Sequence, residues 1–209
     1  MGRLKKLRDS LHYSFYQRWA RFHIEIRRML PTDPIDPNRL PPIYHDLYFL
    51  YREIRRRRPG YVLEFGCGYS TLVIAKALYD NGGGEAWSLE TEPYWANNTR
   101  QMIPHILDNH YRILEVGVTD KDYGEDKALW FSEIPNCIPE FIYVDAPATD
   151  SEIQGVANIL EMEPLFKKGF FMVVDGRKQA VKFFRKNLRR NYVFQDRRLF
   201  GNSAFELIG

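Results

Sequence analysis

The chain has 209 residues, of which 44% are hydrophobic and 27% are charged, and it contains two cysteines. This length supplies one well-buried core and is somewhat short for two domains. No run of about 18 apolar residues occurs, which argues against a membrane-spanning helix. The cysteines have no ligand-like spacing. We therefore expect a cytoplasmic protein with reduced cysteines and no structural zinc.

The formal net charge of +3 is concentrated at the N-terminus. Residues 1–30 contain eight Lys or Arg residues against two acids, whereas the rest of the chain contains 22 against 25. Apolar residues recur there at every third or fourth position, which predicts an amphipathic helix. A Pro-rich segment over 31–38 ends that helix. We therefore divide the chain into a basic helical arm with its linker, residues 1–38, and a main domain, residues 39–209.

The main domain begins with a predicted helix over 42–58, and from Tyr61 onwards short apolar runs alternate with helical stretches. This alternation is typical of βα units around a mostly parallel sheet. The predicted strands are 61–65, 86–90, 112–116, 141–145 and 170–175, and the predicted helices are 70–79, 93–109, 151–166 and 178–190. Two further runs, 192–197 and 204–208, predict a C-terminal hairpin. We expect a three-layer α/β/α Rossmann-like fold with a seven-stranded, mostly parallel sheet, preceded by N-terminal helices.

A glycine-containing turn follows the first predicted strand, in the segment from Glu64 to Ser70. Its glycines, Gly66 and Gly68, let the backbone approach a ligand and leave N–H groups free near the start of a helix. The second predicted strand ends at Glu90, where a carboxylate can accept hydrogen bonds from both ribose hydroxyls. Taken separately, the loop could be a tight turn or a phosphate site, and Glu90 a helix-capping acid. Together they predict a nucleoside cofactor.

The loop departs from a dinucleotide-binding pattern, because Thr71 stands where that pattern has its third glycine and an acid, Glu64, precedes the first glycine by two residues. With Glu90, these features resemble the motifs of class I S-adenosylmethionine-dependent methyltransferases. The resemblance covers residues 61–209 and departs at Ser70, where that family usually has its third glycine. A NAD or nucleotide-sugar enzyme of related fold agrees less well with these residues.

The resemblance also implies roles within the cofactor site. The acid before the glycines helps to position the amino group of the methionine, the acid after the second strand binds the ribose, and the residues that follow the third strand lie near the adenine. Val118 is included among these adenine-side candidates. The implied cofactor-binding residues are Glu64, Gly66, Gly68, Ser70, Glu90, Thr119 and Asp120.

Two further acids, Asp145 and Asp175, end the fourth and fifth predicted strands, where ligands bind in open α/β sheets. They are our candidate catalytic residues and candidate Mg²⁺ ligands, because two carboxylates can hold a divalent cation that lowers the pKa of an acceptor hydroxyl. In metal-dependent catechol-type O-methyltransferases, however, an amide residue directly follows the second of these acids. This chain has Gly176 at that position. Two alternatives to metal binding stay open: Asp145 acts as a general base, or both acids only organise loops or cap helices. Two interpretations of Arg177 and Lys178 stay open: they neutralise an acidic acceptor, or they only begin a helix.

The leading hypothesis is an enzyme that methylates an oxygen on a small-molecule, lipid or saccharide acceptor. Methylation of a nitrogen is the weaker form of this hypothesis. The alternative is a noncatalytic binding or assembly protein of the same fold that acts through residues 1–30. That arm is suited to an anionic membrane surface, to self-association, or to packing on its own domain. The run Arg55–Arg58 would form a basic patch if solvated, but without a recognised docking module nucleic acid is the weaker partner.

Overall fold

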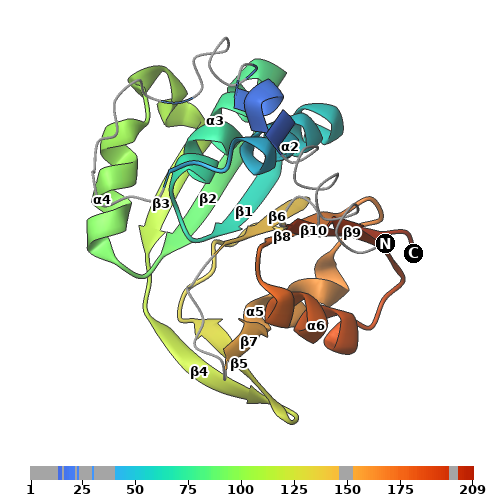
Figure 1. The fold of residues 1–209 in the computed structure, drawn as a ribbon. Helices are drawn as coiled ribbons and strands as arrows, with labels where there is room; N and C mark the ends of the chain where they lie inside the picture. Colours follow the sequence, from blue (N-terminus) through green and yellow to red (C-terminus); the bar gives the residue numbers. More distant parts are fainter. Residues whose placement is uncertain are drawn as a thin grey trace.

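A central seven-stranded sheet organises the computed structural model, which describes residues 14–15, 17–21, 23, 30, 41–145, 153–197 and 202–209 (Figure 1). The strand order is β3-β2-β1-β6-β8-β10-β9. Neighbouring strands are parallel except at β10, which is antiparallel to both β8 and β9. This arrangement confirms the predicted mostly parallel sheet with a C-terminal hairpin. The strands are β1 (Tyr61–Phe65), β2 (Glu85–Glu90), β3 (Tyr111–Glu115), β6 (Phe141–Val144), β8 (Phe171–Asp175), β9 (Tyr192–Arg197) and β10 (Asn202–Leu207).

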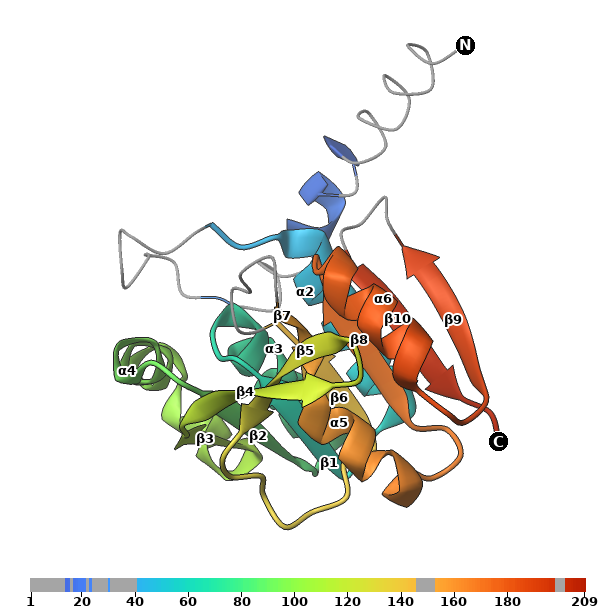
Figure 2. The ribbon, with the colours of Figure 1, turned by 90° about the horizontal axis from the view of Figure 1, so that it is seen from below.

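Helices cover both faces of this sheet, which confirms the three-layer fold (Figure 1). The helices α2 and α3 lie on one face with α4 packed against α3, and α5 and α6 lie on the other. Figure 2 shows α4 and the β9–β10 hairpin at opposite edges of the sheet. The helices are α2 (Tyr44–Arg57), α3 (Tyr69–Asn81), α4 (Pro93–Met102), α5 (Ala157–Met162) and α6 (Lys178–Asn187), with 3₁₀ turns at His105–His110 and Glu163–Leu165.

The two-residue period of a strand divides the core between the two faces. In β6, Phe141 and Tyr143 face α2 and α3, whereas Ile142 and Val144 face α5 and α6. All four are buried, so both faces of the strand are apolar, as expected for a parallel strand covered on each side. This burial holds the carboxyl ends of the strands in fixed positions.

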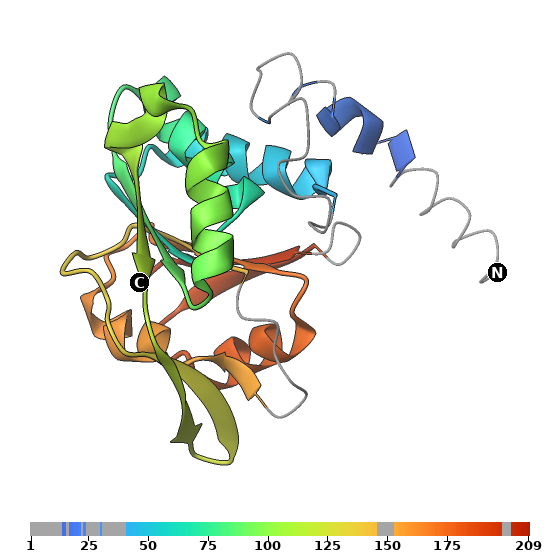
Figure 3. The ribbon, with the colours of Figure 1, turned by 90° about the vertical axis from the view of Figure 1, so that its left-hand side faces the viewer.

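A second, three-stranded sheet was not predicted. It consists of β4 (Val118–Tyr123), β5 (Asp126–Phe131) and β7 (Ile153–Val156), in the order β4-β5-β7. The β4–β5 hairpin continues from β3 and projects away from the main sheet (Figure 3). The expected helix over 151–166 is therefore wrong at its beginning, because 153–156 is a strand and the helix covers only 157–162. The residues 151 and 152 lie outside the described part of the chain.

The expected helix over 93–109 is interrupted. It ends at Met102, and a 3₁₀ turn begins after Pro104. A proline has no backbone N–H to donate and restrains the residue before it to extended conformations, and Ile103 is extended accordingly.

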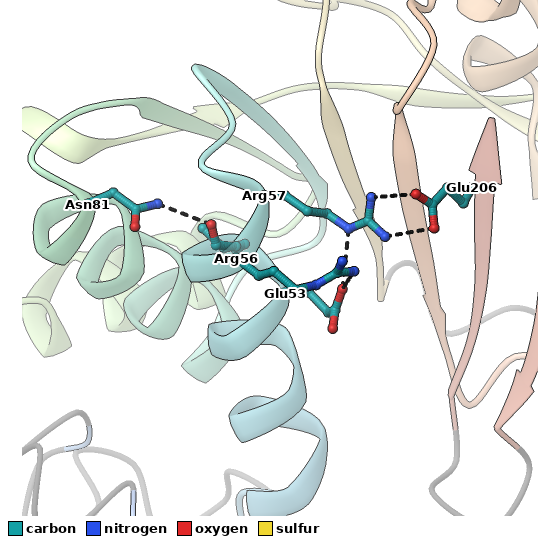
Figure 4. A network of polar contacts seen from close by, with 6 residues as sticks. Glu53, Arg56, Arg57, Asn81 and Glu206 are labelled. Carbon is teal, nitrogen blue, oxygen red and sulfur yellow. Dashed lines mark hydrogen bonds and ion pairs between the residues drawn. The ribbon is translucent and has the colours of Figure 1, made fainter. Parts of the chain in front are cut away.

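The run Arg55–Arg58 is solvated only in part, because Arg56 and Arg58 are exposed whereas Arg57 is bound within the protein. Arg57 binds both carboxylate oxygens of Glu206 in β10, at 2.9 and 3.1 Å, and its Nε donates to Glu53 at 3.2 Å (Figure 4). Its guanidinium also lies 3.6 Å from the ring centroid of Phe171. The partly buried, bidentate geometry makes this ion pair stronger than an ordinary surface pair. It joins α2 to the C-terminal hairpin and weakens the argument for a nucleic-acid partner.

The described residues of the N-terminal arm contact α2. The Trp19 ring lies 4.9 Å from that of Tyr48, edge to face, and the side-chain oxygen of Gln17 accepts the His45 N–H at 3.2 Å. Ala20 is buried. This part of the arm therefore packs on its own domain, while most of the predicted apolar stripe lies outside the described residues. In the described part of the chain, none of the helices has the length and apolar character needed to span a membrane.

We predict that Gly155→Ala destabilises the protein. A methyl group at this position in β7 would lie 2.3 Å from Cδ1 of Phe183, which is buried in α6. We expect overpacking to lower the free energy of unfolding, measured by urea denaturation, by about 1–3 kcal/mol. Gly83→Ala is the control, because a methyl group there meets no atom within 4 Å. Equal stability of the two variants would contradict the packing of α6 on β7.

Candidate functional site

The turn after β1 requires a glycine at its first glycine position. Gly66 has a φ of 105°, a conformation that residues with a side chain rarely adopt. Its N–H donates to the carbonyl of Leu89 at 2.8 Å, which ties the turn to the end of β2. Gly68 then precedes α3, and its N–H donates to the hydroxyl of Thr71 at 3.0 Å. The loop is thus held between β2 and the first turn of α3.

Glu64 lies at the centre of the site and is fully buried. Its Oε2 accepts hydrogen bonds from the hydroxyls of Thr71, at 2.7 Å, and Ser88, at 2.5 Å. Ser88 is the parallel-strand partner of Glu64, so the sheet register places it there. Burial raises the pKa of Glu64 to about 7, although the hydroxyls of Ser70, Ser88 and Thr71 oppose this shift. Ser88 and the role of Thr71 were not predicted.

The other carboxylate oxygen of Glu64, Oε1, remains an unfilled acceptor. It is buried, and no described residue forms a hydrogen bond to it, although the Ser70 hydroxyl lies close enough to Glu64 to lower the pKa of its carboxyl group. An unfilled buried acceptor costs about 1–3 kcal/mol unless a ligand or water satisfies it. A primary ammonium group beside the glycine turn would satisfy it. The donor set of this site therefore fits the amino end of S-adenosylmethionine.

Glu90 has the capping contacts that the sequence left open as the alternative to ribose binding. Its Oε1 accepts the backbone N–H groups of Thr91 and Glu92, at 2.8 and 3.0 Å, and its Oε2 accepts that of Cys67 at 3.2 Å. The acid therefore caps the chain before α4 and fixes the glycine loop. A carboxylate accepts about four hydrogen bonds. One position, on Oε2, is left for a ribose hydroxyl, where the sequence led us to expect two.

Thr119 and Asp120 lie in β4, in the second sheet, with exposed side chains. Val116 instead follows β3 beside the end of β2, and its N–H donates to the carbonyl of Glu90 at 2.9 Å. This hydrogen bond places the backbone of Val116 beside Glu90. A position of Thr119 and Asp120 on the adenine side stays a prediction.

Asp145 and Asp175 end the neighbouring parallel strands β6 and β8 and form the second part of the site. The Arg177 Nη2 atom lies 3.0 Å from Asp145 Oδ1, and the Tyr143 hydroxyl donates to Asp175 Oδ2 at 2.9 Å. Burial and the charge of Asp175 raise the pKa of Asp145, which Arg177 partly offsets. Burial likewise raises the pKa of Asp175, against the effects of Tyr143 and Arg177. The structure thus brings the two predicted acids together.

The donor set at these strand ends does not fit a divalent cation. No group of three or more His, Cys, Asp or Glu residues suited to a metal occurs in the described ranges. Gly176, with a φ of 59°, offers no side chain where an amide ligand was sought. The guanidinium of Arg177 binds Asp145, one of the two acids a cation would need. Mg²⁺ binding by Asp145 and Asp175 therefore finds no support in this geometry.

Residues from the beginning and the end of the main domain meet beside Asp175. Asn202 is the antiparallel partner of Asp175, and its Nδ2 donates to Asp46 of α2 at 2.6 Å. Asp46 Oδ1 also lies 3.2 Å from His45 Nε2. Asn202 and Asp46 are buried and 156 residues apart, so no local motif signals the contact. Only the placement of β10 beside β8 would have revealed it.

No protein-family model and no curated protein matches the sequence. Solved structures do match its fold. A methyltransferase from Geobacter sulfurreducens is 15% identical, with a TM-score of 0.55, over 90% of this chain and 96% of that one. The SAH-bound methyltransferase PaMTH1 from Podospora anserina is 13% identical, with a TM-score of 0.55, over 94% and 88%. An O-methyltransferase from Bacillus cereus in complex with SAH is 15% identical, with a TM-score of 0.53, over 93% and 91%.

The chain has the class I methyltransferase fold. The strand order β3-β2-β1-β6-β8-β10-β9, with its reversed β10, contains the mostly parallel sheet and the C-terminal hairpin that the sequence predicted. The class I methyltransferase fold accordingly accounts for the placement of the glycine turn, Glu90 and the two strand-end acids along one edge of the sheet.

We predict that Glu64 makes stability depend on pH. Because its pKa is about 7 in the folded state and near 4.5 when unfolded, the folded state retains the proton longer. The free energy of unfolding should therefore fall as the pH rises from about 4.5 to about 7. Glu64→Gln should remove this contribution, which amounts to about 3 kcal/mol. Urea denaturation of both proteins at several pH values isolates it as their difference; two parallel curves would show that Glu64 is not the group responsible.

Proposed function

We propose that this chain is an S-adenosylmethionine-dependent methyltransferase that methylates a hydroxyl oxygen of a small-molecule, lipid or saccharide acceptor. The observation that carries the proposal is the unfilled Oε1 of Glu64, buried beside a glycine turn on the class I methyltransferase fold. A buried acceptor at that place matches the ammonium group that distinguishes this cofactor from a dinucleotide. The O-methyltransferase among the similar structures supports oxygen as the nucleophile.

The cofactor-binding residues of the proposal lie at the ends of β1 and β2 and in the first turn of α3. Glu64 accepts the ammonium, Gly66 and Gly68 let the backbone approach the methionine portion, and Oε2 of Glu90 accepts a ribose hydroxyl. When bound, S-adenosylmethionine supplies an electrophilic methyl group, whose bond to sulfur breaks with the electron pair left on sulfur. Ser70, buried in the first turn of α3, lies beside Glu64 and lowers the pKa of its carboxyl group.

Asp145 acts in this proposal as the general base. Its side chain is 44% exposed and so is accessible to an acceptor, although Arg177 binds its Oδ1. The surrounding protein, which replaces part of the hydration of this partly exposed carboxyl, and the charge of Asp175 raise the pKa of Asp145, and Arg177 opposes them. The shift is toward the range in which a carboxylate removes a hydroxyl proton effectively. Asp145 takes that proton, and the acceptor oxygen becomes the nucleophile. The hydrogen bond from Tyr143 to Asp175 holds these two side chains in place at the end of β8.

We predict that S-adenosylmethionine and S-adenosylhomocysteine bind with a roughly micromolar Kd and that NAD does not, as measured by calorimetric titration. Glu90→Gln should weaken both by about tenfold, because it replaces a charged acceptor of the ribose hydroxyl with a neutral one. Glu92→Gln is the control, since Glu92 is exposed two residues away.

Two results would contradict the cofactor assignment: binding of NAD as tight as that of S-adenosylmethionine, or an unchanged Kd in Glu90→Gln. If neither methionine-derived ligand binds a protein whose circular dichroism shows it to be folded, the noncatalytic interpretation replaces the proposal.

We predict that Asp145→Asn leaves cofactor binding unchanged and lowers turnover by about 10²–10⁴-fold, because the amide does not accept the proton. Release of S-adenosylhomocysteine measures turnover with a panel of phenol, catechol and saccharide acceptors. Asp122→Asn, at an exposed position in β4, is the matched control. A variant of Asp145 with full turnover would remove its role as general base.

A further inference from the structure

We infer that Arg177 takes the place of a divalent cation at the acceptor site, so that methyl transfer by this chain is independent of metal ions. The inference rests on the proposed function for the reaction that it describes. Its structural basis is independent of that function, because it concerns the groups that the two strand-end acids already bind.

Each of the two carboxylates has one oxygen bound by a donor of the protein. Arg177 Nη2 lies 3.0 Å from Asp145 Oδ1, and the Tyr143 hydroxyl donates to Asp175 Oδ2. A cation between the acids would have to bind through their other oxygens, beside the positive charge of Arg177, and would need further oxygen ligands around it. A guanidinium never loses its charge in a protein, so it neutralises acids permanently, whereas a cation does so only when bound.

A tight turn after β8 determines where Arg177 lies. Gly176 adopts a left-handed conformation directly after β8, and Arg177 then precedes α6 as its N-terminal cap residue. The tight turn brings the arginine back to the end of β6, where Asp145 lies. The Arg177 side chain is 23% exposed, so the protein around it restrains it. The turn therefore provides a fixed positive charge at the strand ends.

Arg177 also has a hydrogen-bond donor that no described residue accepts. The Nε atom of Arg177 is buried, and it donates to no residue that the structure describes. A catalytic metal does two things at such a site: it holds the carboxylates, and it offers an open position to an acceptor oxygen. Arg177 does the first through Nη2 and is equipped for the second through Nε.

The experiment measures metal binding directly, using the whole chain. Mn²⁺ alone is the probe, and electron paramagnetic resonance reports the free ion. We expect weak binding by the wild-type protein and an affinity at least about tenfold higher in Arg177→Ala, because removing the guanidinium exposes two uncompensated carboxylates. Arg177→Lys, which keeps a positive charge, should show a much smaller gain. The double variant Arg177→Ala/Asp175→Asn should lose the gain.

Arg100→Ala is the matched control. Arg100 binds Glu115 at the end of β3 at 2.7 Å, so the variant also frees a strand-end acid. The register partner of Glu115 is Glu90, which already accepts three backbone N–H groups and so is less able to share a cation. It should leave Mn²⁺ affinity unchanged. An equal gain in Arg100→Ala, or no gain in a folded Arg177→Ala, would overturn the inference.

The wild-type protein provides a second test that needs no variant. S-adenosylhomocysteine release should be unaffected by EDTA and by added Mg²⁺. Release that EDTA abolishes and Mg²⁺ restores would overturn the inference even if Arg177→Ala fails to fold. If S-adenosylmethionine does not bind at all, the proposed function fails, while the Mn²⁺ measurements still decide the role of Arg177.

Discussion

The burial of a carboxyl group at the end of the central strand β1 is the constraint on which this site depends. Glu64 is fully buried and is held by the hydroxyls of Thr71, from α3, and Ser88, from β2. A charge so far from water is costly unless hydrogen bonds surround it. The same bonds that reduce this cost also position the glycine turn, because Thr71 accepts the N–H of Gly68. One acid thus links strand, loop and helix, and the burial that makes this link possible raises its pKa.

The two halves of the site solve the problem of buried negative charge in different ways. At β1 and β2, hydroxyl and backbone N–H donors surround Glu64 and Glu90, and these donors carry no charge. At β6 and β8, a guanidinium neutralises Asp145 instead. Neutral donors leave the first half attractive to a positively charged ligand. The fixed cation in the second half leaves it less attractive to a metal ion. The chemistry that the chain can support follows from this division.

Most of the main sheet was predictable from the sequence, because its strands are buried on both faces and therefore form continuous apolar runs. The turn at Gly66 and the acids at the strand ends were predictable for the same reason: each directly follows such a run. The β4–β5 hairpin was missed because its exposed residues break that pattern, and the β7 segment because it was read as the start of a helix. The contact of Asn202 with Asp46 depends on strand order and lies beyond any local signal. Arg177 was singled out for a partner outside the protein, whereas its bound partner, Asp145, is 32 residues away.

The strand order at the end of the sheet also affects how a newly made chain folds. β9 is made before β10 but reaches the sheet only through it, because β10 pairs with β8 on one side and with β9 on the other. Until β10 is synthesised, β8 therefore has an open edge whose backbone groups can pair with another chain. The Arg57–Glu206 ion pair forms only when that edge closes. An incomplete or slowly finished chain is thus the form of this protein most exposed to aggregation, and the cell's chaperones would meet it at this edge.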